Sequence, residues 1–459
     1  MTWNKKNNPK NPREVVQNTT NSSIDGGWAW VVTFACCIGI MLSMALWNTL
    51  GIFYTRMKDD LNFEMTSLTI IGSTHSALVL SGAVVVVPIV EKFGERPVII
   101  MGGILQFIGC FATGWMTSFP LMFVFMGVIT GIGSASIFVT CLMAVDKYFD
   151  KKKSIAIPLA SIGGSLSMTI FTPVTETILD TFGFAGGMMV YSAIMLNIVV
   201  CGTVVFPIKQ KDSKQPNKPG EKVDMSFCRQ PSFIAYMITN VLFVAGSMIP
   251  IGLLPETASS VGVDVEDISI TFSLSGALQI LGRVLFSLIS YRIPSRITLL
   301  WVIFMVAMGL TMLIVPFSTN MYHFMIFNLF GGFFIGGVNL GFNLSLKNLI
   351  DIRYYGRGLS LALLMQGIGG LLGNPIAALL LEATGDGGVP YYFGALLFII
   401  AGGLLIPFSK AIREHKQEII IKVTKDKIKA SSRRVSKASI MIEDPDYDRE
   451  AEFHDYSNI

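Results

Sequence analysis

Long apolar runs of about 20 residues alternate with short polar connections along most of the chain. A run of this length, coiled as an α-helix, spans the hydrocarbon core of a bilayer. Twelve such runs can be counted, and each predicts one transmembrane helix. Their bounds are 30–54, 66–90, 97–118, 120–145, 154–178, 184–207, 232–255, 268–290, 297–318, 320–346, 358–380 and 390–409. The pattern therefore predicts an all-α membrane protein with twelve transmembrane helices.

A polar connection divides the twelve runs into two equal groups. This connection, Lys209–Arg229, is rich in Lys, Asp, Gln and Pro, and six runs lie on each side of it. Equal halves are what duplication of a six-helix unit leaves, so we predict two pseudo-symmetric six-helix bundles. The predicted organisation is a tail over 1–24, bundles over 25–207 and 232–409, a linker over 208–231 and a disordered tail over 410–459.

Composition supports a membrane protein and argues against several classes of function. Of the 459 residues, 52% are hydrophobic and only 14% are charged, whereas soluble domains carry about 25% charged residues. The net charge of +4 gives no indication of nucleic-acid binding. The six cysteines lack metal-ligand spacing, and the sequence contains no catalytic triad or phosphate-binding loop. We therefore predict a protein that is not an enzyme, holds no cofactor or metal, and is not an ATP-driven pump.

The distribution of Lys and Arg predicts the orientation in the membrane. If both termini are cytoplasmic, 32 of the 35 basic residues fall in the tails, the linker and the connections on the cytoplasmic side. Only Arg56 and Lys58 fall outside, and Arg283 lies within a span. Cytoplasmic segments of membrane proteins carry the excess of Lys and Arg. The counts thus predict that both termini and the linker face the cytoplasm.

Arg283 is the only Lys or Arg placed well inside an apolar run. A guanidinium stays protonated and is costly to place in hydrocarbon, so it requires a wet cavity, an anionic partner or a short reach to the headgroups. Polar residues recur every four positions around it, on one slowly turning face of the eighth helix. They are Thr271, Ser275, Gln279 and Ser287. We expect this face to line a central cavity; the alternative is that Arg283, roughly 10 Å from the cytoplasmic end, extends to the headgroups.

The tenth run carries two further amides, Asn339 and Asn343. An amide in a transmembrane helix either hydrogen-bonds a substrate or holds neighbouring helices together. Both interpretations stay open for this run, and Asn343 is retained as a candidate for substrate binding.

Two short motifs open the first and fifth predicted spans. The first is Asp25-Gly26-Gly27-Trp28-Ala29-Trp30, in which the glycines permit a tight turn and the tryptophans suit the membrane interface. The second is Tyr148-Phe149-Asp150-Lys151-Lys152-Lys153, a basic cluster that leads into a helix face of small residues. Small residues at helical spacing let helices pack closely.

Together the two motifs closely resemble the signatures of the monocarboxylate transporter family, a branch of the major facilitator superfamily. The first motif matches throughout, whereas in the second Pro158 stands where the family usually has glycine. The resemblance covers about residues 25–410. It implies a structural or gating role for the motif residues Asp25, Gly26, Gly27, Trp28, Trp30, Tyr148, Lys151 and Lys152.

The resemblance also implies a substrate site. The family's lactate carriers use a lysine in span one, an aspartate and an arginine four residues apart in span eight, and a glutamate in span eleven. Here the arginine is kept as Arg283, but the other positions hold Asn48, Gln279 and Gln366. With amides in place of three ionisable groups, proton-coupled lactate transport is not supported. The stretch from Asn48 to Gly51 is similar to the branch that carries aromatic amino acids and iodothyronines without protons.

These features predict a multi-pass transporter of the plasma membrane that moves a small carboxylate-bearing solute by alternating access. Arg283 would bind the carboxylate, and Asn48, Gln279, Gln366 and Asn343 would supply neutral hydrogen bonds. Two alternatives stay open: a proton-independent carrier of an aromatic amino acid or another zwitterion or amine such as creatine, and a transport-inactive sensor or scaffold. The resemblance further implies that a single-span glycoprotein can serve as a chaperone partner.

Overall fold

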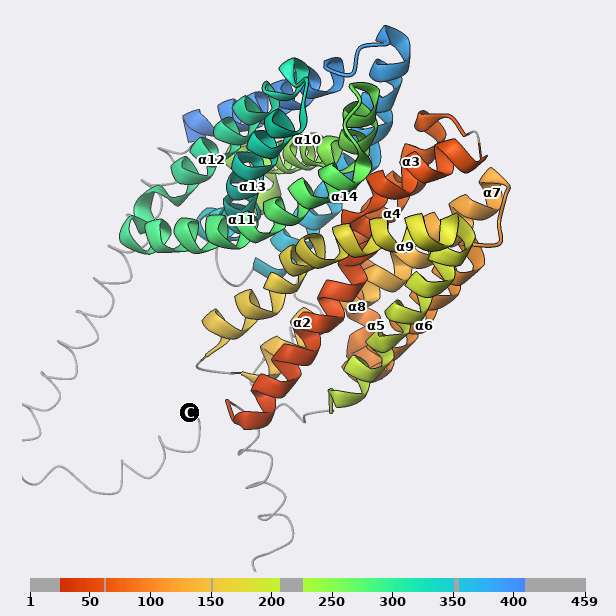
Figure 1. Cartoon of the computed structure of the whole chain (residues 1–459). Coiled ribbons are helices and arrows are strands. Elements are labelled where there is room, and N and C mark those ends of the chain that lie inside the picture. The colour runs from red at the N-terminus through yellow and green to blue at the C-terminus, as the bar shows by residue number, and fades with distance from the viewer. Residues whose placement is uncertain (1–24, 62, 150–151, 207–225, 351–354, 409–459) are drawn as a thin grey trace, which may run out of the picture. The chain divides into compact units, whose positions relative to one another are not determined.

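The computed structural model describes residues 25–61, 63–149, 152–206, 226–350 and 355–408 (Figure 1). Within these ranges the chain is helical and contains no strand, as the sequence predicts. The first helices are α2 (Gly27–Asn48), α3 (Leu50–Leu61), α4 (Met65–Ser81), α5 (Ala83–Phe93), α6 (Glu95–Thr113), α7 (Phe119–Met122), a π-helical segment (Phe123–Ile129), α8 (Thr130–Tyr148) and α9 (Lys153–Val204). They are followed by α10 (Pro231–Ser260), α11 (Val265–Arg292), α12 (Ile297–Met312), α13 (Met321–Leu349), α14 (Tyr355–Thr384) and a last helix, Val389–Phe408. The predicted tails over 1–24 and 410–459 lie outside the described residues.

The structure does not by itself confirm the predicted number of twelve membrane spans. In the described part of the chain, ten helices are long and apolar enough to cross a membrane, or eleven if α4 and α5 form one span. Those two helices meet at Gly82 with a bend of 51°. A side chain at Gly82 would meet the Ala135 methyl group at 2.5 Å, so the absence of a side chain lets α8 approach closely.

Helix α9 covers the predicted fifth and sixth spans together. Its 52 residues contain one non-helical residue, Gly183, where two helices join at a kink. The backbone φ of Gly183 is 66°, a left-handed conformation that glycine adopts without steric cost. In Figure 1 the chain turns back along α9, so that its two parts run beside different neighbours.

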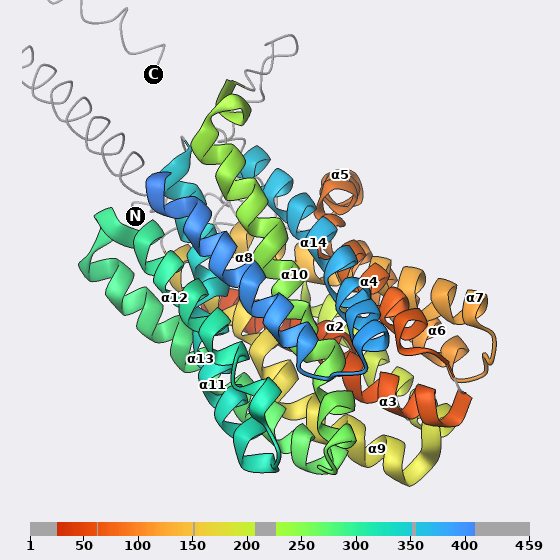
Figure 2. The ribbon, with the colours of Figure 1, turned by 90° about the horizontal axis from the view of Figure 1, so that it is seen from above.

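Two sets of helices pack closely, and they meet along three main seams. In the first set α9 packs against α2 and α6, and α8 packs against α2, α4 and α6. In the second set α13 packs against α11 and α12, and α10 packs against α14. The seams between the sets are α9 with α11, α4 with α14 (Figures 1 and 2) and α3 with α10.

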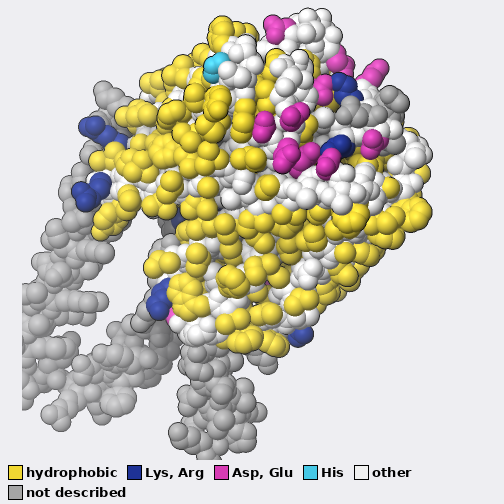
Figure 3. Space-filling view, viewed as in Figure 1, with side chains coloured by type: hydrophobic (Ala, Val, Ile, Leu, Met, Phe, Trp, Pro, Cys, Tyr) yellow, Lys and Arg dark blue, Asp and Glu magenta, His cyan; other side chains and the backbone are white. Residues whose placement is uncertain are grey.

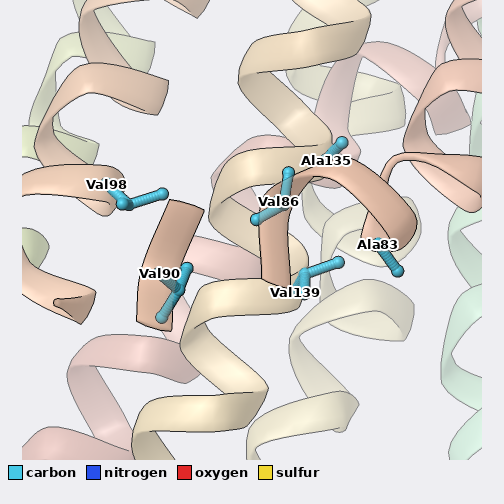
Figure 4. Packing of buried hydrophobic residues seen from close by; sticks show 6 residues of the cluster. All are labelled: Ala83, Val86, Val90, Val98, Ala135 and Val139. Carbon is cyan, nitrogen blue, oxygen red and sulfur yellow. The ribbon is translucent and has the colours of Figure 1, made fainter. Parts of the chain in front are cut away.

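A small apolar cluster holds the bent α4–α5 segment against the rest of the first set. It consists of Ala83, Val86, Val90, Val98, Ala135 and Val139, from α5, α6 and α8 (Figure 4). Leu363 of α14 packs against the same cluster. The cluster therefore joins the first set of helices to one edge of the second.

The surface in Figure 3 is largely apolar around the helical bundle, as expected for helices that face lipid. Phe34, Leu281 and Ile303 are examples of large side chains that are more than half exposed. Acidic side chains gather at one end of this face, at the upper right.

Candidate substrate site

Arg283 lies on α11 and is directed at α9. Its Nη1 donates a hydrogen bond to the backbone oxygen of Ser161 at 2.9 Å. Its buried Nε has no hydrogen-bond partner, and none of the described acidic residues forms an ion pair with it. The neighbouring Leu281 and Val284 are more than half exposed, whereas Arg283 is partly buried. The guanidinium thus lies at the seam between the two helix sets and keeps donor capacity for another anion.

Gln279 lies one turn before Arg283 and also contacts α9. Its Oε1 accepts a hydrogen bond from the Ser165 hydroxyl at 3.3 Å, and its Nε2 lies 3.1 Å from the sulfur of Met168. Asn48, at the end of α2, donates from Nδ2 to the backbone oxygen of Gly164 at 3.1 Å. Three of the predicted substrate-site residues therefore converge on one stretch of α9, residues 161–168.

An antiparallel register between α9 and α11 produces this convergence. Ser273 donates to the backbone of Thr169, Gln279 contacts Ser165, and Arg283 contacts Ser161, so each step back along α9 matches a step forward along α11. The helices approach closely because α11 has glycine between these contacts. A side chain at Gly276 would lie 2.5 Å from the Thr169 hydroxyl and 2.8 Å from the Ser165 backbone oxygen.

The other two predicted site residues have different surroundings or partners. Gln366 on α14 is buried and donates from Nε2 to Oδ1 of Asn240 on α10 at 2.9 Å. Asn240 in turn donates to the Tyr236 backbone oxygen at 2.8 Å, so this amide pair joins α10 to α14. Asn343 is partly buried on α13, and no described residue hydrogen-bonds its side chain. In the described part of the chain, no hydrogen bond therefore joins Gln366 or Asn343 to the α9 stretch that the other three contact.

Sequence reasoning missed the α9 partners of these residues. Ser161 and Gly164 take part through backbone oxygens, which every residue type has, so no sequence pattern marks them. Ser165 and Met168 contact Gln279 through side chains. The small-residue pattern before them was the one available signal, and it indicates close helix packing rather than binding.

The two sequence motifs contact each other at the start of α9. The backbone N–H of Asp25 donates to the Tyr148 oxygen at 3.1 Å, and Asp25 Oδ1 accepts from the Lys152 N–H at 3.3 Å. The Trp30 ring stacks edge-on against Phe149 with centroids 5.0 Å apart, and the Lys152 amine lies 5.9 Å from the Trp30 ring centroid. A carboxylate at the start of a helix is stabilised by the helix dipole, so this contact ties the start of α2 to the start of α9.

The remaining motif residues surround that junction. Gly26 is the N-terminal cap of α2 and Gly27 its first residue, and half-exposed Trp28 contacts the Phe206 ring at 5.8 Å. The Tyr148 hydroxyl donates to the Phe206 backbone oxygen at 2.7 Å. Lys151 lies outside the described residues. The contacts between the two motifs therefore fix the position of the start of α9 relative to α2.

An ion pair and a hydrogen bond join the helix sets at the other end of the molecule. Lys58 of α3 forms an ion pair with Glu256 of α10, and the Thr66 N–H donates to Glu382 of α14 at 2.9 Å. A side chain at Gly51 would lie 3.0 Å from the Pro255 ring. Near the start of α9 and the end of α11, by contrast, the two helices separate in Figure 1, and the surface is hollowed between them in Figure 3.

Comparison with known proteins assigns this architecture. Residues 36–251 and 236–435 each match the model of the Major Facilitator Superfamily. The chain belongs to the Major Facilitator Superfamily. It is therefore a membrane transporter and not an enzyme, and the predicted resemblance to monocarboxylate transporters is confirmed by its relatives.

Relatives of this superfamily member extend over most of its length. It is 25% identical over 383 residues to monocarboxylate transporter 13 of Bos taurus, covering 83% of this chain and 89% of that protein. It is 26% identical over 425 residues to monocarboxylate transporter 2 of Homo sapiens, covering 86% and 89%.

Solved structures share its fold. A POT family transporter in complex with 5-aminolevulinic acid superposes with a TM-score of 0.69 at 13% identity, covering 83% of this chain and 96% of that one. A mutant of the nucleoside transporter NupG gives a TM-score of 0.64 at 15% identity, covering 83% and 98%. At these identities the likeness concerns the fold.

Proposed function

We propose that this protein carries a small carboxylate-bearing organic solute across the plasma membrane, and that Arg283 binds the carboxylate. The observation that carries the proposal is the position of Arg283. Its guanidinium lies at the α9–α11 seam, donates to a backbone oxygen and has no described acidic partner. A guanidinium fork fits a carboxylate by two parallel hydrogen bonds. The names of the relatives, monocarboxylate transporters, support the same class of solute.

The proposed topology has twelve spans in two six-helix bundles, with both termini in the cytoplasm. The 52 residues of α9 would extend roughly 78 Å as one straight helix, whereas a span needs about 30 Å. Counting its two parts on either side of Gly183, and α4 with α5 as one, gives the twelve that the sequence predicts. In this orientation the Lys58–Glu256 ion pair and the hydrogen bond from Thr66 to Glu382 lie on the extracellular side of the membrane. The contact of Asp25 with Lys152 lies on the cytoplasmic side.

Alternating access follows from where the two helix sets are joined. The contacts at Lys58 and Glu382 close the outer end, while α9 and α11 separate toward the inner end. A solute would enter this state from the cytoplasm and meet Arg283 where the helices converge. Rocking of the two bundles would then part the outer contacts and bring the inner ends together.

We further propose that transport is by uniport or exchange and is not coupled to protons. Asn48 and Gln279, whose side chains hydrogen-bond the same stretch of α9 as Arg283, are amides, and neither can take up a proton with the solute. No observation favours an amino-acid carrier or a scaffold. A single-span glycoprotein partner stays a prediction.

Uptake by cells that express the protein tests the proposal. A labelled panel of monocarboxylates, aromatic amino acids and creatine should show uptake of monocarboxylates, with competition among them. An inward proton gradient should leave the rate of monocarboxylate uptake nearly unchanged. Uptake of amino acids or creatine alone, with surface expression verified, would contradict the carboxylate assignment. Strong acceleration by the gradient would contradict proton independence only. Repeating the panel with co-expressed single-span glycoproteins checks whether surface delivery limits the result.

The ion pair between Lys58 and Glu256 predicts a charge-swap result. Lys58→Glu places two carboxylates opposite each other, so we expect the outer end to close less readily and uptake to change about two- to fivefold, since partly exposed pairs contribute about 0.2–1 kcal/mol. The double variant Lys58→Glu with Glu256→Lys should restore uptake to within about twofold of the original rate. The single variants Lys58→Glu and Glu256→Lys each change uptake by a measurable factor. If the double variant changes uptake by the product of these two factors, the ion pair does not govern closure of the outer end.

A further inference from the structure

Gly164 differs from the other described glycines of the helices. An ideal Cβ built on Gly164 meets no atom within 4 Å, although the residue is partly buried. The preceding residue, Gly163, has no such free space. A Cβ on Gly163 would overlap the Cys37 backbone oxygen and lie 3.1 Å from the Met41 nitrogen. Close packing therefore explains Gly163 but does not explain Gly164.

The open space at Gly164 lies inside the protein and not toward lipid. In this part of α9 the exposed large apolar residues are Ile155, Leu159 and Ile170, and Pro158 beside them is exposed as well. At about 100° per residue, Gly164 lies on the opposite side of the helix from their mean direction. Among the described glycines, Gly27, Gly164 and Gly403 have a negative φ and no atom within 4 Å of an added Cβ. Gly27 and Gly403 are exposed, so Gly164 is the one of these three that faces the interior.

The proposed substrate residues surround this space. Gly163 faces α2 on one side of Gly164, and Ser161 and Ser165 face α11 on the other. The Gly164 backbone oxygen accepts from Asn48. Arg283 therefore contacts α9 about one turn before Gly164. In the other direction, one turn along α9, lies the apolar side chain of Met168.

We propose that Gly164 sets the upper size limit for the organic part of the transported carboxylate. With the carboxylate at Arg283, the rest of the solute extends along the bare surface of Gly164 toward Met168. A side chain at residue 164 would occupy the space that a branched or aromatic group of the solute needs. The inference rests on the proposed function of Arg283 and adds a specificity residue to it.

Uptake of three 2-oxo acids tests the size limit, because they share one carboxylate and differ only in their side chain: methyl, isobutyl and benzyl. Wild-type protein should carry all three. Gly164→Leu should lower uptake of the benzyl acid relative to the methyl acid by about tenfold or more, since a few added methylenes in a fitted site discriminate at this level. Gly164→Ala should give a smaller change in the same direction.

Gly403→Leu is the matched control, because it adds the same side chain at an open but exposed position. It should leave the ratios among the three acids unchanged. Equal scaling of all three acids by Gly164→Leu, at equal surface expression, would overturn the inference, and so would a wild type that excludes the isobutyl and benzyl acids. Uptake of none of the three by wild type would overturn the proposed function as well. If Arg283→Lys abolishes uptake while Gly164→Leu leaves the ratios unchanged, the size limit alone is wrong.

A Gly164→Cys variant checks the site with a side chain smaller than leucine. A small water-soluble methanethiosulfonate reagent should modify Cys at this position in membranes, and the methyl 2-oxo acid should slow the modification. Wild-type protein, which retains all six native cysteines, provides the background. Absence of modification above this background, or modification that substrate does not slow, would overturn the inference even if Gly164→Leu fails to reach the surface.

Discussion

Lysine in place of Arg283 is expected to reduce carboxylate uptake about 10- to 100-fold while leaving the amount of protein at the surface unchanged. The ammonium keeps the charge but loses the planar fork, so the carboxylate loses one of two parallel hydrogen bonds. A hydrogen bond to a charged group contributes about 1.5–3 kcal/mol, and each 1.4 kcal/mol corresponds to a factor of ten. Arg283→Gln should lower uptake further, because it also removes the charge. Initial rates of labelled uptake, normalised to surface protein, measure both effects.

Arg292→Lys is the control for Arg283→Lys, since Arg292 is exposed at the end of the same helix. It should transport like wild type. The headgroup interpretation of Arg283 predicts a different result, because a lysine reaches the membrane interface as well as an arginine does. Normal uptake by Arg283→Lys would therefore support that interpretation and remove the proposed anion site.

The residues with unusual chemistry could be found from the sequence. Arg283 could be singled out because a charge within an apolar run is costly, and Gln279 because it lies one turn away on the same face. The resemblance added Asn48. The structure places all three against α9, but that partner could not be predicted, because two of the contacts are made to backbone oxygens. Gln366 also came from the resemblance, and its hydrogen bond to Asn240 depends on a helix pairing that no single run reveals.

The lengths of apolar segments are easier to predict than the breaks within them. Hydropathy predicts where a span can lie, but it contains no information about the 51° bend at Gly82 or the φ of 66° at Gly183. Both breaks occur at glycines, which are frequent in this chain and have several roles. At Gly82 a side chain would overlap Ala135, and at Gly183 the backbone adopts a left-handed conformation. Only the packed structure distinguishes these roles.

Gly282→Ala is expected to prevent most of the protein from folding, because Gly282 is the point where α11 crosses α13. A Cβ at this position would overlap the Phe333 backbone oxygen and lie 2.9 Å from its carbonyl carbon. Backbone atoms cannot move aside as a flexible side chain can, so the helices must separate. Overpacking costs about 1–3 kcal/mol even where side chains adjust, so overlap with backbone atoms costs more than this and removes much of the about 5–15 kcal/mol by which a protein is stable.

Fluorescence-detected size-exclusion chromatography of tagged variants measures this effect as the fraction that elutes as a single monodisperse peak. Gly403→Ala is the matched control, because the added methyl group meets no atom within 4 Å. It should behave as wild type, whereas Gly282→Ala should lose most of the peak. Because Gly282 directly precedes Arg283, any folded remainder should also have a displaced guanidinium and a reduced rate of carboxylate uptake per molecule. A full peak with normal uptake would mean that α11 and α13 do not meet at this glycine, and the contact of Arg283 with α9 would then need to be re-examined.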